Sequence, residues 1–281
     1  MKKLFFLVFC YLSLASNVSA GSIIFSRPQV TQGEPLLITL VASSTPQTVT
    51  LEGKRLNIFS YAGAYHSLLG INLNKKIGDY VVSVVWSDGV VATGTFTVLP
   101  RLRYEAPLGI PDKLGGNTVQ AGVSLVSTLA KENATLLNLR TGRHAFWTEA
   151  FRPPLATTTV TDTYGYSRQT GGQSITHKGT DYRATLGTPV YAMNRGVVRL
   201  TKTYTVYGKT IILDHGLGVQ TLYMHLSKIL VNPGELVLPG QVIGWSGDTG
   251  YAETPHLHLS VRIGEISIDP EVFLGLFENG L

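Results

Sequence analysis

Cysteine is almost absent from this chain of 281 residues: its single thiol, Cys10, lies in an apolar run near the N-terminus. If that run is a leader that is removed, the remaining chain contains no cysteine. Disulfide bonds and zinc sites built from thiolates are then excluded. Any metal ligands must be histidine or carboxylate side chains.

Charge is also scarce, at 15% of residues against 44% hydrophobic residues. This balance excludes a disordered chain and permits a sizeable core. No long run of Lys or Arg occurs, so we expect no nucleic-acid partner. The formal net charge of +5 falls to +3 when Lys2 and Lys3 are removed, which suits an anionic polymer as partner.

No apolar run reaches the roughly 20 residues that span a bilayer. The N-terminus instead has the pattern of a signal peptide, because Lys2 and Lys3 precede a mostly apolar run at residues 4–14 and small residues follow at 18–20. We therefore expect residues 1–20 to be cleaved and the chain to be exported, without stable insertion in a membrane. A retained membrane anchor is the alternative.

The first half of the chain predicts β structure. Residues 21–100 contain short strand-like runs bounded by turns, and the run at 80–86 is dominated by β-branched residues. We predict an immunoglobulin-like β-sandwich here. It contains no cluster of His, Cys or carboxylate groups, which favours a spacer or binding module.

Residues 101–145 are predicted to be a linker with a short helical connector. Apolar residues with helical spacing occur within 120–140: Val123, Leu125, Val126, Leu129 and Leu136. We expect this helix to pack between the domains. A propeptide-like position over the active site is the alternative, and deletion of residues 21–140 would test it.

Residues 146–281 return to strand patterns and predict an antiparallel sheet that forms the floor of a narrow groove. The loops around residues 164–176, 202–208 and 246–255 are expected to form the groove walls. The whole chain is therefore predicted to be mainly β, with two domains.

Five of the seven histidines follow residue 170, and His66 and His144 stand apart as structural residues. His177 precedes Asp181 by four residues, and Gly179 between them permits the backbone to bend. Imidazole nitrogen and carboxylate oxygen both suit zinc. This spacing alone is weak evidence, because a surface His with a nearby Asp is common.

Two strand-like motifs hold three further histidines. In His256-Leu257-His258, alternation places both imidazoles on one face of a strand. In Tyr223-Met224-His225 the same alternation places Tyr223 beside His225. Each motif alone also fits a polar strand face without function.

In combination, these motifs resemble the lysostaphin-type zinc metallopeptidases of cell walls, in the same order along the chain. The sequences between them are similar to the family as well: YGYSR at 164–168, GTPVYA at 187–192, DHG at 214–216, PGQVIG at 239–244 and GDTG at 247–250. The resemblance covers roughly residues 147–275 and does not extend to the first domain. It implies a C-terminal antiparallel-sheet peptidase domain at residues 146–281.

The resemblance implies that His177, Asp181 and His258 bind one Zn²⁺ per chain. It also implies that His225 and His256 are catalytic partners beside the metal, and that His215 is structural. Three protein ligands leave a fourth position for water, as in catalytic zinc sites.

The implied function is hydrolysis of peptide cross-links in bacterial cell-wall peptidoglycan, with the periplasm as the preferred location and the cell wall or medium as alternatives. A non-catalytic wall-binding protein or regulator on the same fold is the alternative function. No feature of the sequence sets the oligomeric state.

Two features depart from related sequences or motifs. No His-Glu-x-x-His motif occurs, so the glutamate base of that motif is missing and a neutral imidazole must accept the proton. Either His225 or His256 can do so, and Tyr223 is a further candidate to donate to the oxyanion. The family often has Glu where this chain has Ser260, so a contact with substrate or with a ligand differs there.

Overall fold

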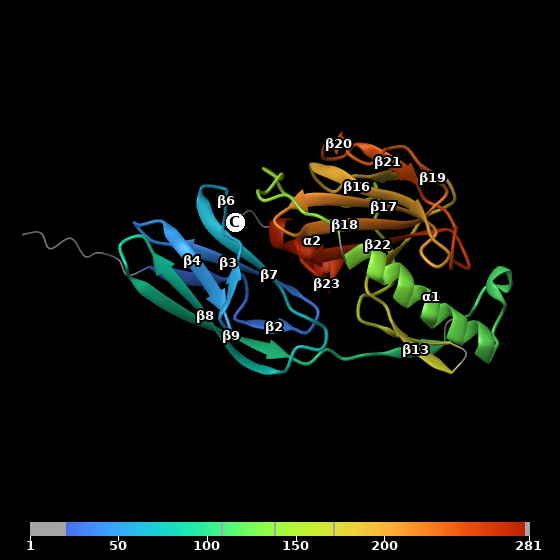
Figure 1. Cartoon of the computed structure of the whole chain (residues 1–281), viewed down its shortest axis with the longest axis horizontal. Helices are drawn as coiled ribbons and strands as arrows, with labels where there is room; N and C mark the ends of the chain where they lie inside the picture. The colour runs from blue at the N-terminus through green and yellow to red at the C-terminus, as the bar shows by residue number, and fades with distance from the viewer. Residues whose placement is uncertain (1–20, 108, 138, 171, 279–281) are drawn as a thin grey trace, which may run out of the picture.

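The computed structural model describes residues 21–107, 109–137, 139–170 and 172–278. The expected leader, residues 1–20, lies outside this described part of the chain. The protein is mainly β, as predicted: a β-sandwich leads through a connecting segment with one long helix into a larger C-terminal domain (Figure 1). Within the described residues, neither α-helix combines the length and apolar character needed to cross a bilayer.

The sandwich is built from two sheets, in the orders β1-β3-β7-β6 and β2-β9-β8-β4-β5. Its strands are β1 (Ser22–Phe25), β2 (Gln29–Thr31), β3 (Pro35–Val41), β4 (Pro46–Leu51), β5 (Lys54–Leu56), β6 (Phe59–Tyr61), β7 (Ala64–Gly70), β8 (Gly78–Trp86) and β9 (Val91–Leu99). In β8, Tyr80, Val82, Val84 and Trp86 are buried while the residues between them are not. This alternation places Val82 and Val84, with Tyr80 and Trp86, in the core between the sheets.

The connecting segment contains β10 (Glu105–Pro107), the short 3₁₀-helix η1 (Asp112–Leu114) and the helix α1 (Val119–Leu137). The Thr118 hydroxyl oxygen accepts a hydrogen bond from the Ala121 N–H (3.1 Å) and so caps the first turn of α1. The predicted helix is therefore present, close to its expected bounds.

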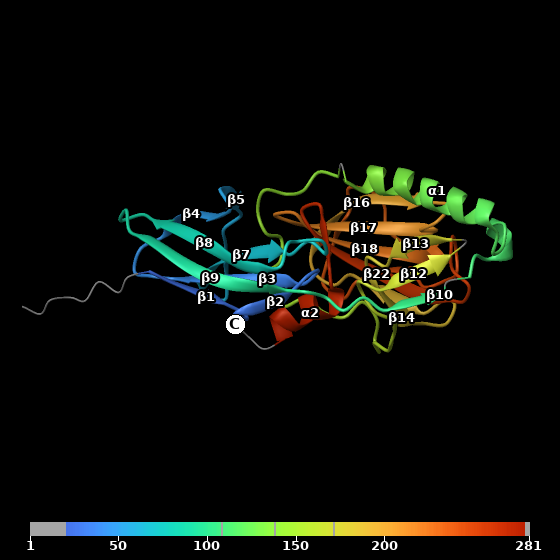
Figure 2. The ribbon, with the colours of Figure 1, turned by 90° about the horizontal axis from the view of Figure 1, so that it is seen from below.

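The expectation that this helix packs between the domains is wrong. Figure 2 shows α1 alongside the C-terminal sheet. Leu125 joins an apolar cluster with Val206 and Tyr251, and Leu136 joins another with residues of β17 and β18. The apolar stripe of α1 thus finds its partners on the C-terminal domain, along most of the length of the helix.

The C-terminal domain is organised around a sheet with the order β11-β14-β22-β18-β17-β16-β20, and β23 pairs with β22. Small sheets β15-β21-β19 and β10-β12-β13 flank it. The elements are β11 (Val160–Asp162), β12 (Ser167–Thr170), β13 (Gln173–Thr176), β14 (Thr180–Arg183), β15 (Pro189–Tyr191), β16 (Gly196–Thr203), β17 (Lys209–Gly216), β18 (Val219–Leu226), β19 (Lys228–Ile229), β20 (Leu236–Val237), β21 (Val242–Trp245), β22 (His256–Ile263), β23 (Ile266–Ile268) and α2 (Pro270–Glu278). The predicted antiparallel sheet is confirmed, and its central strands β14, β22 and β18 carry the site described next.

Candidate active site

His177, Asp181 and His258 converge at one point. His177 follows β13, and Asp181 in β14 lies directly opposite His258 in β22 in the antiparallel register. His177 Nε2 is 3.0 Å from His258 Nδ1 and 3.1 Å from Asp181 Oδ1, and the last two atoms are 2.7 Å apart. All three residues are buried. Three ligand atoms this close together, each on a side chain that binds metals, form a group that can hold one metal ion.

The hydrogen bonds on the outer side of the His177 and His258 rings favour metal binding by these two residues. His177 Nδ1 donates to the Thr163 carbonyl oxygen (2.8 Å), which can only accept, so His177 Nε2 is the free acceptor. His258 Nε2 lies 3.0 Å from the Ser260 hydroxyl, which itself donates to the Lys178 carbonyl (2.8 Å). His258 Nε2 therefore donates to Ser260, and His258 Nδ1 is left for a metal. Such outer hydrogen bonds fix the ring orientation of metal-binding histidines.

Gly179 has a different role from the one the sequence suggested. Its backbone φ is not positive, but an added Cβ would lie 2.4 Å from His258 Nε2 and 2.4 Å from the Leu259 carbonyl oxygen. Glycine is needed here because β22 approaches the backbone closely, so that the turn after His177 can pass beside His258.

Arg168 in β12 holds the second oxygen of Asp181. Its Nη2 donates to Asp181 Oδ2 and to Asp162 Oδ2, each at 2.5 Å. Burial alone would raise the pKa of Asp181, but His177 and His258 outweigh it and hold that pKa well below its usual value. Asp181 is therefore a carboxylate with one oxygen engaged by Arg168 and the other facing the two imidazoles.

His225 and His256 flank the three converging residues. Their ring centroids are 4.9 Å apart, and the His225 centroid is 5.9 Å from that of His258. His225 Nδ1 donates to the Thr249 carbonyl (2.9 Å), and His256 Nδ1 donates to the Thr254 carbonyl (2.8 Å). Both Nε2 atoms are therefore acceptors in the neutral rings. Burial, followed by the neighbouring His256 and His258, lowers the pKa of His225 to about 3, which keeps this ring neutral near pH 7.

Tyr223 does not share a face with His225, and this prediction is wrong. His225 has a φ of 59°, in the left-handed region, and the pairing of β17 with β18 shifts register next to it. Strand alternation ends there. The Tyr223 ring is fully buried in the core, where its hydroxyl oxygen accepts a hydrogen bond from the Met193 N–H (3.0 Å), so it cannot donate to an oxyanion in the groove.

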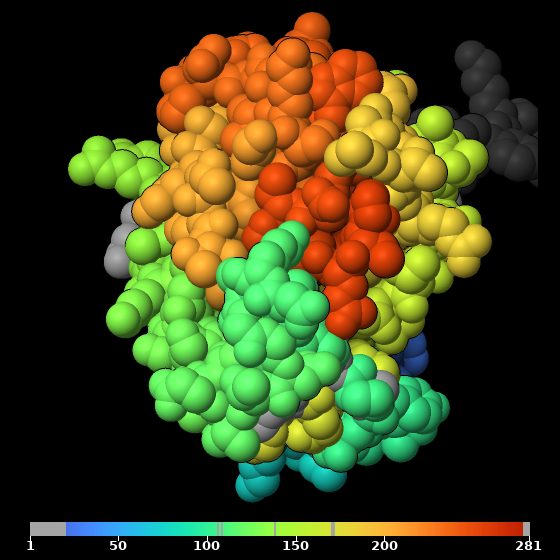
Figure 3. Space-filling view, turned by 90° about the vertical axis from the view of Figure 1, so that its right-hand side faces the viewer, coloured from blue at the N-terminus to red at the C-terminus, as the bar shows by residue number. Residues whose placement is uncertain are grey.

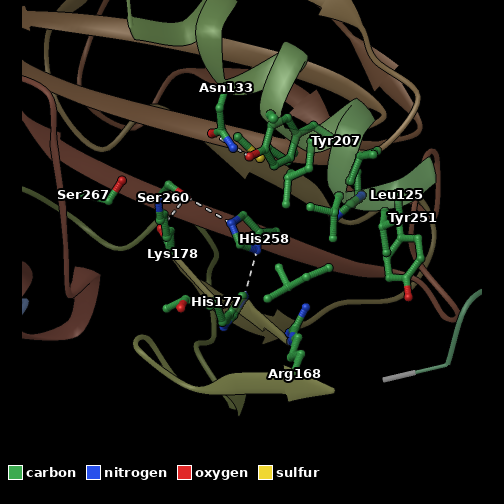
Figure 4. A pocket seen from close by; sticks show the side chains of 18 of the residues that line it. Leu125, Asn133, Arg168, His177, Lys178, Tyr207, Tyr251, His258, Ser260 and Ser267 are labelled. Atoms are coloured by element: carbon green, nitrogen blue, oxygen red, sulfur yellow. Dashed lines mark hydrogen bonds between the residues drawn. The ribbon is translucent and has the colours of Figure 1, made fainter. Parts of the chain in front are cut away.

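A groove of about 340 Å³ runs past the site. The three expected loops contribute to its lining, through Arg168 with residues 174–176, Val206 with Tyr207, and Tyr251. The helix α1 forms a fourth wall and lines the groove with Leu125, Val126, Leu129, Ala130 and Asn133, a position closer to the alternative over the active site than to the expected one between the domains. Figure 4 shows His258 and His177 between α1 and the β12–β13 hairpin.

The connecting segment also meets the far end of the groove. The Tyr251 hydroxyl donates to the Gly109 carbonyl (2.8 Å), and Lys113 Nζ donates to the Asp248 carbonyl (2.8 Å). Figure 3 looks at this end, where green segments of the connector lie against the orange loops of the C-terminal domain. The connector is thus part of the groove and not a free tether.

The remaining three histidines, His66, His144 and His215, do not line the groove. His215 is fully buried and its Nδ1 donates to the Arg195 carbonyl (2.8 Å). His66 lies within the sandwich, where its Nδ1 is 3.1 Å from the Thr39 hydroxyl. His144 is exposed. These placements agree with the structural interpretation of His66 and His215, and for His144 that interpretation stays a prediction.

Comparison with known proteins finds similarities to the C-terminal domain. Residues 175–270 match the model of Peptidase family M23. The peptidoglycan DD-endopeptidase ShyA of Vibrio cholerae is 48% identical over 87 residues, which cover 31% of this chain and 20% of that protein. The DD-carboxypeptidase/endopeptidase Mpg of Neisseria meningitidis is 37% identical over 118 residues, or 42% of this chain and 27% of Mpg. The matched region thus spans only a fifth to about a quarter of these relatives.

One solved structure is similar across both domains. It is that of a candidate peptidase M23 from Pseudomonas aeruginosa, with a TM-score of 0.64 and 25% sequence identity, and it covers 90% of this chain and 97% of that one. The arrangement of sandwich, connector and C-terminal domain is therefore shared beyond the region of the family match.

Proposed function

We propose that this chain, whose C-terminal domain is a lysostaphin-type peptidase M23 domain, is a zinc-dependent endopeptidase that hydrolyses peptide cross-links of bacterial peptidoglycan. The observation that carries the proposal is the convergence of His177, Asp181 and His258 beside two further imidazoles in a groove. The names of the curated relatives support peptidoglycan as the substrate.

The donor set supports zinc, at one ion per chain. Two imidazole nitrogens and one carboxylate oxygen are a usual set for catalytic zinc, and the outer contacts of both rings leave the correct nitrogens free. Three protein ligands leave a position for water. A bound zinc ion would lower the pKa of that water towards about 7 and polarise the scissile carbonyl.

The protein residues then have separate tasks. Arg168 fixes the Asp181 carboxylate. His225 and His256 present Nε2 as a proton acceptor, because carbonyl oxygens hold both Nδ1 atoms protonated. One of them accepts the proton of the attacking water, and the resulting imidazolium stabilises the oxyanion or gives the proton to the leaving amine.

We also propose export to the periplasm, with cleavage of the predicted leader at residues 1–20. The net charge of +3 after cleavage suits an anionic wall polymer. Detection of mature protein that begins at Gly21 in a periplasmic fraction would support this; full-length protein in the cytosol would contradict it.

Metal analysis combined with wall digestion tests the proposed function. The His177→Ala variant should lose zinc. The His225→Ala variant should keep zinc and lose about 10²-fold to 10⁴-fold in activity, which is the contribution of a general base. His144→Ala is the matched control, because His144 is exposed and belongs neither to the ligand group nor to the groove lining, and it should keep both.

The alternative, a non-catalytic wall-binding protein, makes the opposite prediction for the wild type. Zinc-loaded wild-type protein that binds purified wall but releases no new amine from it would refute the endopeptidase. Loss of zinc from His225→Ala would instead refute the assignment of His225 as a base.

A further inference from the structure

Arg262 lies on the same face of β22 as the metal-site histidine. Leu257, Leu259 and Val261 belong to the core beneath the sheet, so His258, Ser260 and Arg262 point to the groove side. Four residues of extended strand place the Arg262 backbone about 13 Å from that of His258. This is the span of about four residues of an extended peptide.

The positive charge of Arg262 has no compensating anion among the described residues. The residue is 6% exposed, and Nη1 donates to one acceptor, the Leu136 carbonyl (3.1 Å). Its Nε is buried without a hydrogen-bond partner. Burial lowers the pKa of the guanidinium, and only Tyr207 and Tyr204 oppose that effect. A buried cation with most of its five donors unused is costly unless an anion binds there.

Arg262 also lines a second cavity, of about 350 Å³, that adjoins the groove. The two cavities share Asn133, Thr176, Lys178, Arg262 and Ser267. Figure 4 shows Lys178 and Ser267 at one end of the groove, with Tyr251 at the other end. The second cavity therefore extends the groove beyond Lys178, between the C-terminal domain, α1 and residues 72–74 of the sandwich.

The charged side chains that line this second cavity are three cations and one acid. Arg103, next to the sandwich, donates from Nη2 to the Leu73 carbonyl and to Asn74 Oδ1, both at 2.8 Å. Lys178 and Glu265 are exposed, and no salt bridge within the described residues involves Arg103, Lys178 or Arg262. The positive charge is in excess, and it comes from Arg103 of the connecting segment and from Lys178 and Arg262 of the C-terminal domain.

We propose that this cavity is a subsite that binds a free carboxylate of the substrate peptide, held by Arg262 with Arg103 and Lys178 around it. The inference rests on the proposed function and adds a role for the sandwich, which completes the subsite through residues 72–74 and holds Arg103 of the connecting segment beside it. The bound carboxylate is three to four residues from the scissile bond. It belongs either to a side chain or to the C-terminus of the peptide.

Synthetic substrates test the subsite directly. Three peptides share one cleavable bond: one keeps all carboxylates, one carries an amide at the side-chain carboxylate three to four residues away, and one carries an amide only at its C-terminus. Wild-type protein should show kcat/KM about 10-fold to 100-fold lower for one of the two amides, the range expected for loss of a charge-assisted hydrogen bond. The identity of that peptide distinguishes the two sources. Equal kcat/KM for all three overturns the inference.

Variants then assign the preference to these residues. R262Q should reduce the acid-over-amide ratio to about one. R103Q should reduce it about threefold, because Arg103 is exposed and more strongly screened. R195Q is the matched control, since Arg195 is an exposed arginine outside both cavities, and the ratio should not change. If R262Q does not fold, R103Q still tests the inference. An unchanged acid-over-amide ratio in R103Q overturns the proposed subsite.

Binding separates this inference from the proposed function. Calorimetry with the zinc-loaded His225→Ala variant should give a Kd for the preferred acid peptide that is at least 10-fold lower than for its amide. This preference without any cleavage by the wild type would refute the endopeptidase and leave the subsite standing. Cleavage by the wild type without the binding preference would refute the subsite alone.

Discussion

At the scale of residues, the sequence could predict the ligand candidates but not the groups that orient them. His177, Asp181 and His258 are residue types with direct metal chemistry, and their spacing matched a known pattern. Arg168 and the Thr163 carbonyl act only because β12 and the chain before it lie beside β14 in the fold. Nothing in their local sequence indicates a partner that is more than ten residues away.

Substitution of Arg168 tests how much the fixed orientation of the Asp181 carboxylate contributes to metal binding. R168M should weaken zinc affinity about 10-fold to 100-fold, as expected when an outer contact to a ligand is removed. The same change exposes an unpaired oxygen on Asp181 and Asp162. Competition with a chromophoric chelator measures the affinity without reference to activity.

The control for this prediction is R183M. Arg183 lies in β14 two residues from Asp181 and lines the cavity on that side, but it makes no hydrogen bond to Asp181 through its side chain. It should retain the wild-type affinity. Equal losses in both variants would mean that general positive charge, and not the contact to Asp181 Oδ2, accounts for the effect.

His225 shows why a local periodicity can fail. Three residues, Tyr223 to His225, fit a regular strand, and the predicted shared face followed from regular alternation. The left-handed backbone at His225 turns this side chain to the Thr249 carbonyl instead. A non-glycine residue in this region costs free energy, and such positions often occur at functional sites.

His215 gives a pH prediction. Burial lowers its pKa to about 4, against an unfolded value of about 6.5, so the folded state holds the neutral ring. The unfolded state binds one more proton between these two values, and stability must fall as the pH decreases from 6.5 towards 4. The integrated loss is about 3 kcal/mol.

Urea unfolding of wild type and His215→Asn across this pH range measures the contribution. The slope of the unfolding free energy against pH should be smaller in the variant by up to about 1.4 kcal/mol per pH unit. Identical slopes would show that another group titrates in this range and that His215 does not.

At the scale of elements, α1 was predictable and its position was not. Leu125, Leu129 and Leu136 form the stripe that predicted a helix, and Glu132 lies on that same stripe. An acid on the apolar face is a signal that the helix meets a polar partner. That partner is the loop at 205–207, whose N–H groups donate to the buried Glu132 carboxylate at 2.7–3.2 Å.

We expect E132Q to loosen α1 from this loop. An amide provides one acceptor oxygen and buries an NH₂ group without a partner, so unfolding should become easier by about 2 kcal/mol. Because α1 forms a wall of the groove, activity should fall as well. Thermal unfolding and wall digestion measure the two effects.

K131Q is the control for E132Q, because Lys131 is the exposed neighbour on the same helix. It should keep wild-type stability and activity. A rise in the activity of E132Q would contradict the wall interpretation and support a propeptide-like cover, and deletion of residues 21–140 should then raise activity further.

At the scale of the whole molecule, the sequence indicated two β units but not how closely they join. The strand patterns and turns of residues 21–100 predict a sandwich by themselves. The junction depends on long-range contacts, such as the Asp269 N–H that donates to the Gly33 carbonyl (2.8 Å) and the Phe59 ring of the sandwich that packs against Trp147 in a shared apolar cluster. An added Cβ on Gly33 would lie 2.4 Å from the Tyr164 ring, so the two surfaces are in direct contact.

Arg101 is the central residue of this junction and supports the last prediction. Its guanidinium donates to the Gln32 carbonyl (2.7 Å), to the Tyr164 carbonyl (3.3 Å) and to Asp269 Oδ2 (3.0 Å), so it joins the sandwich to the C-terminal domain. R101A would leave Asp269, which is 9% exposed, without its cation. Loss of one partner of a buried pair costs about 3 kcal/mol.

The expected result is a lower melting temperature, together with faster proteolysis within residues 101–118, because the sandwich can then move relative to the C-terminal domain. If the sandwich completes the substrate subsite, R101A should also reduce the preference for the acid peptide, although residue 101 lines neither cavity. R27A is the control, because Arg27 pairs with Glu34 within the sandwich alone. A preference that survives in R101A after the junction has opened would show that the C-terminal domain recognises the carboxylate without help from the sandwich.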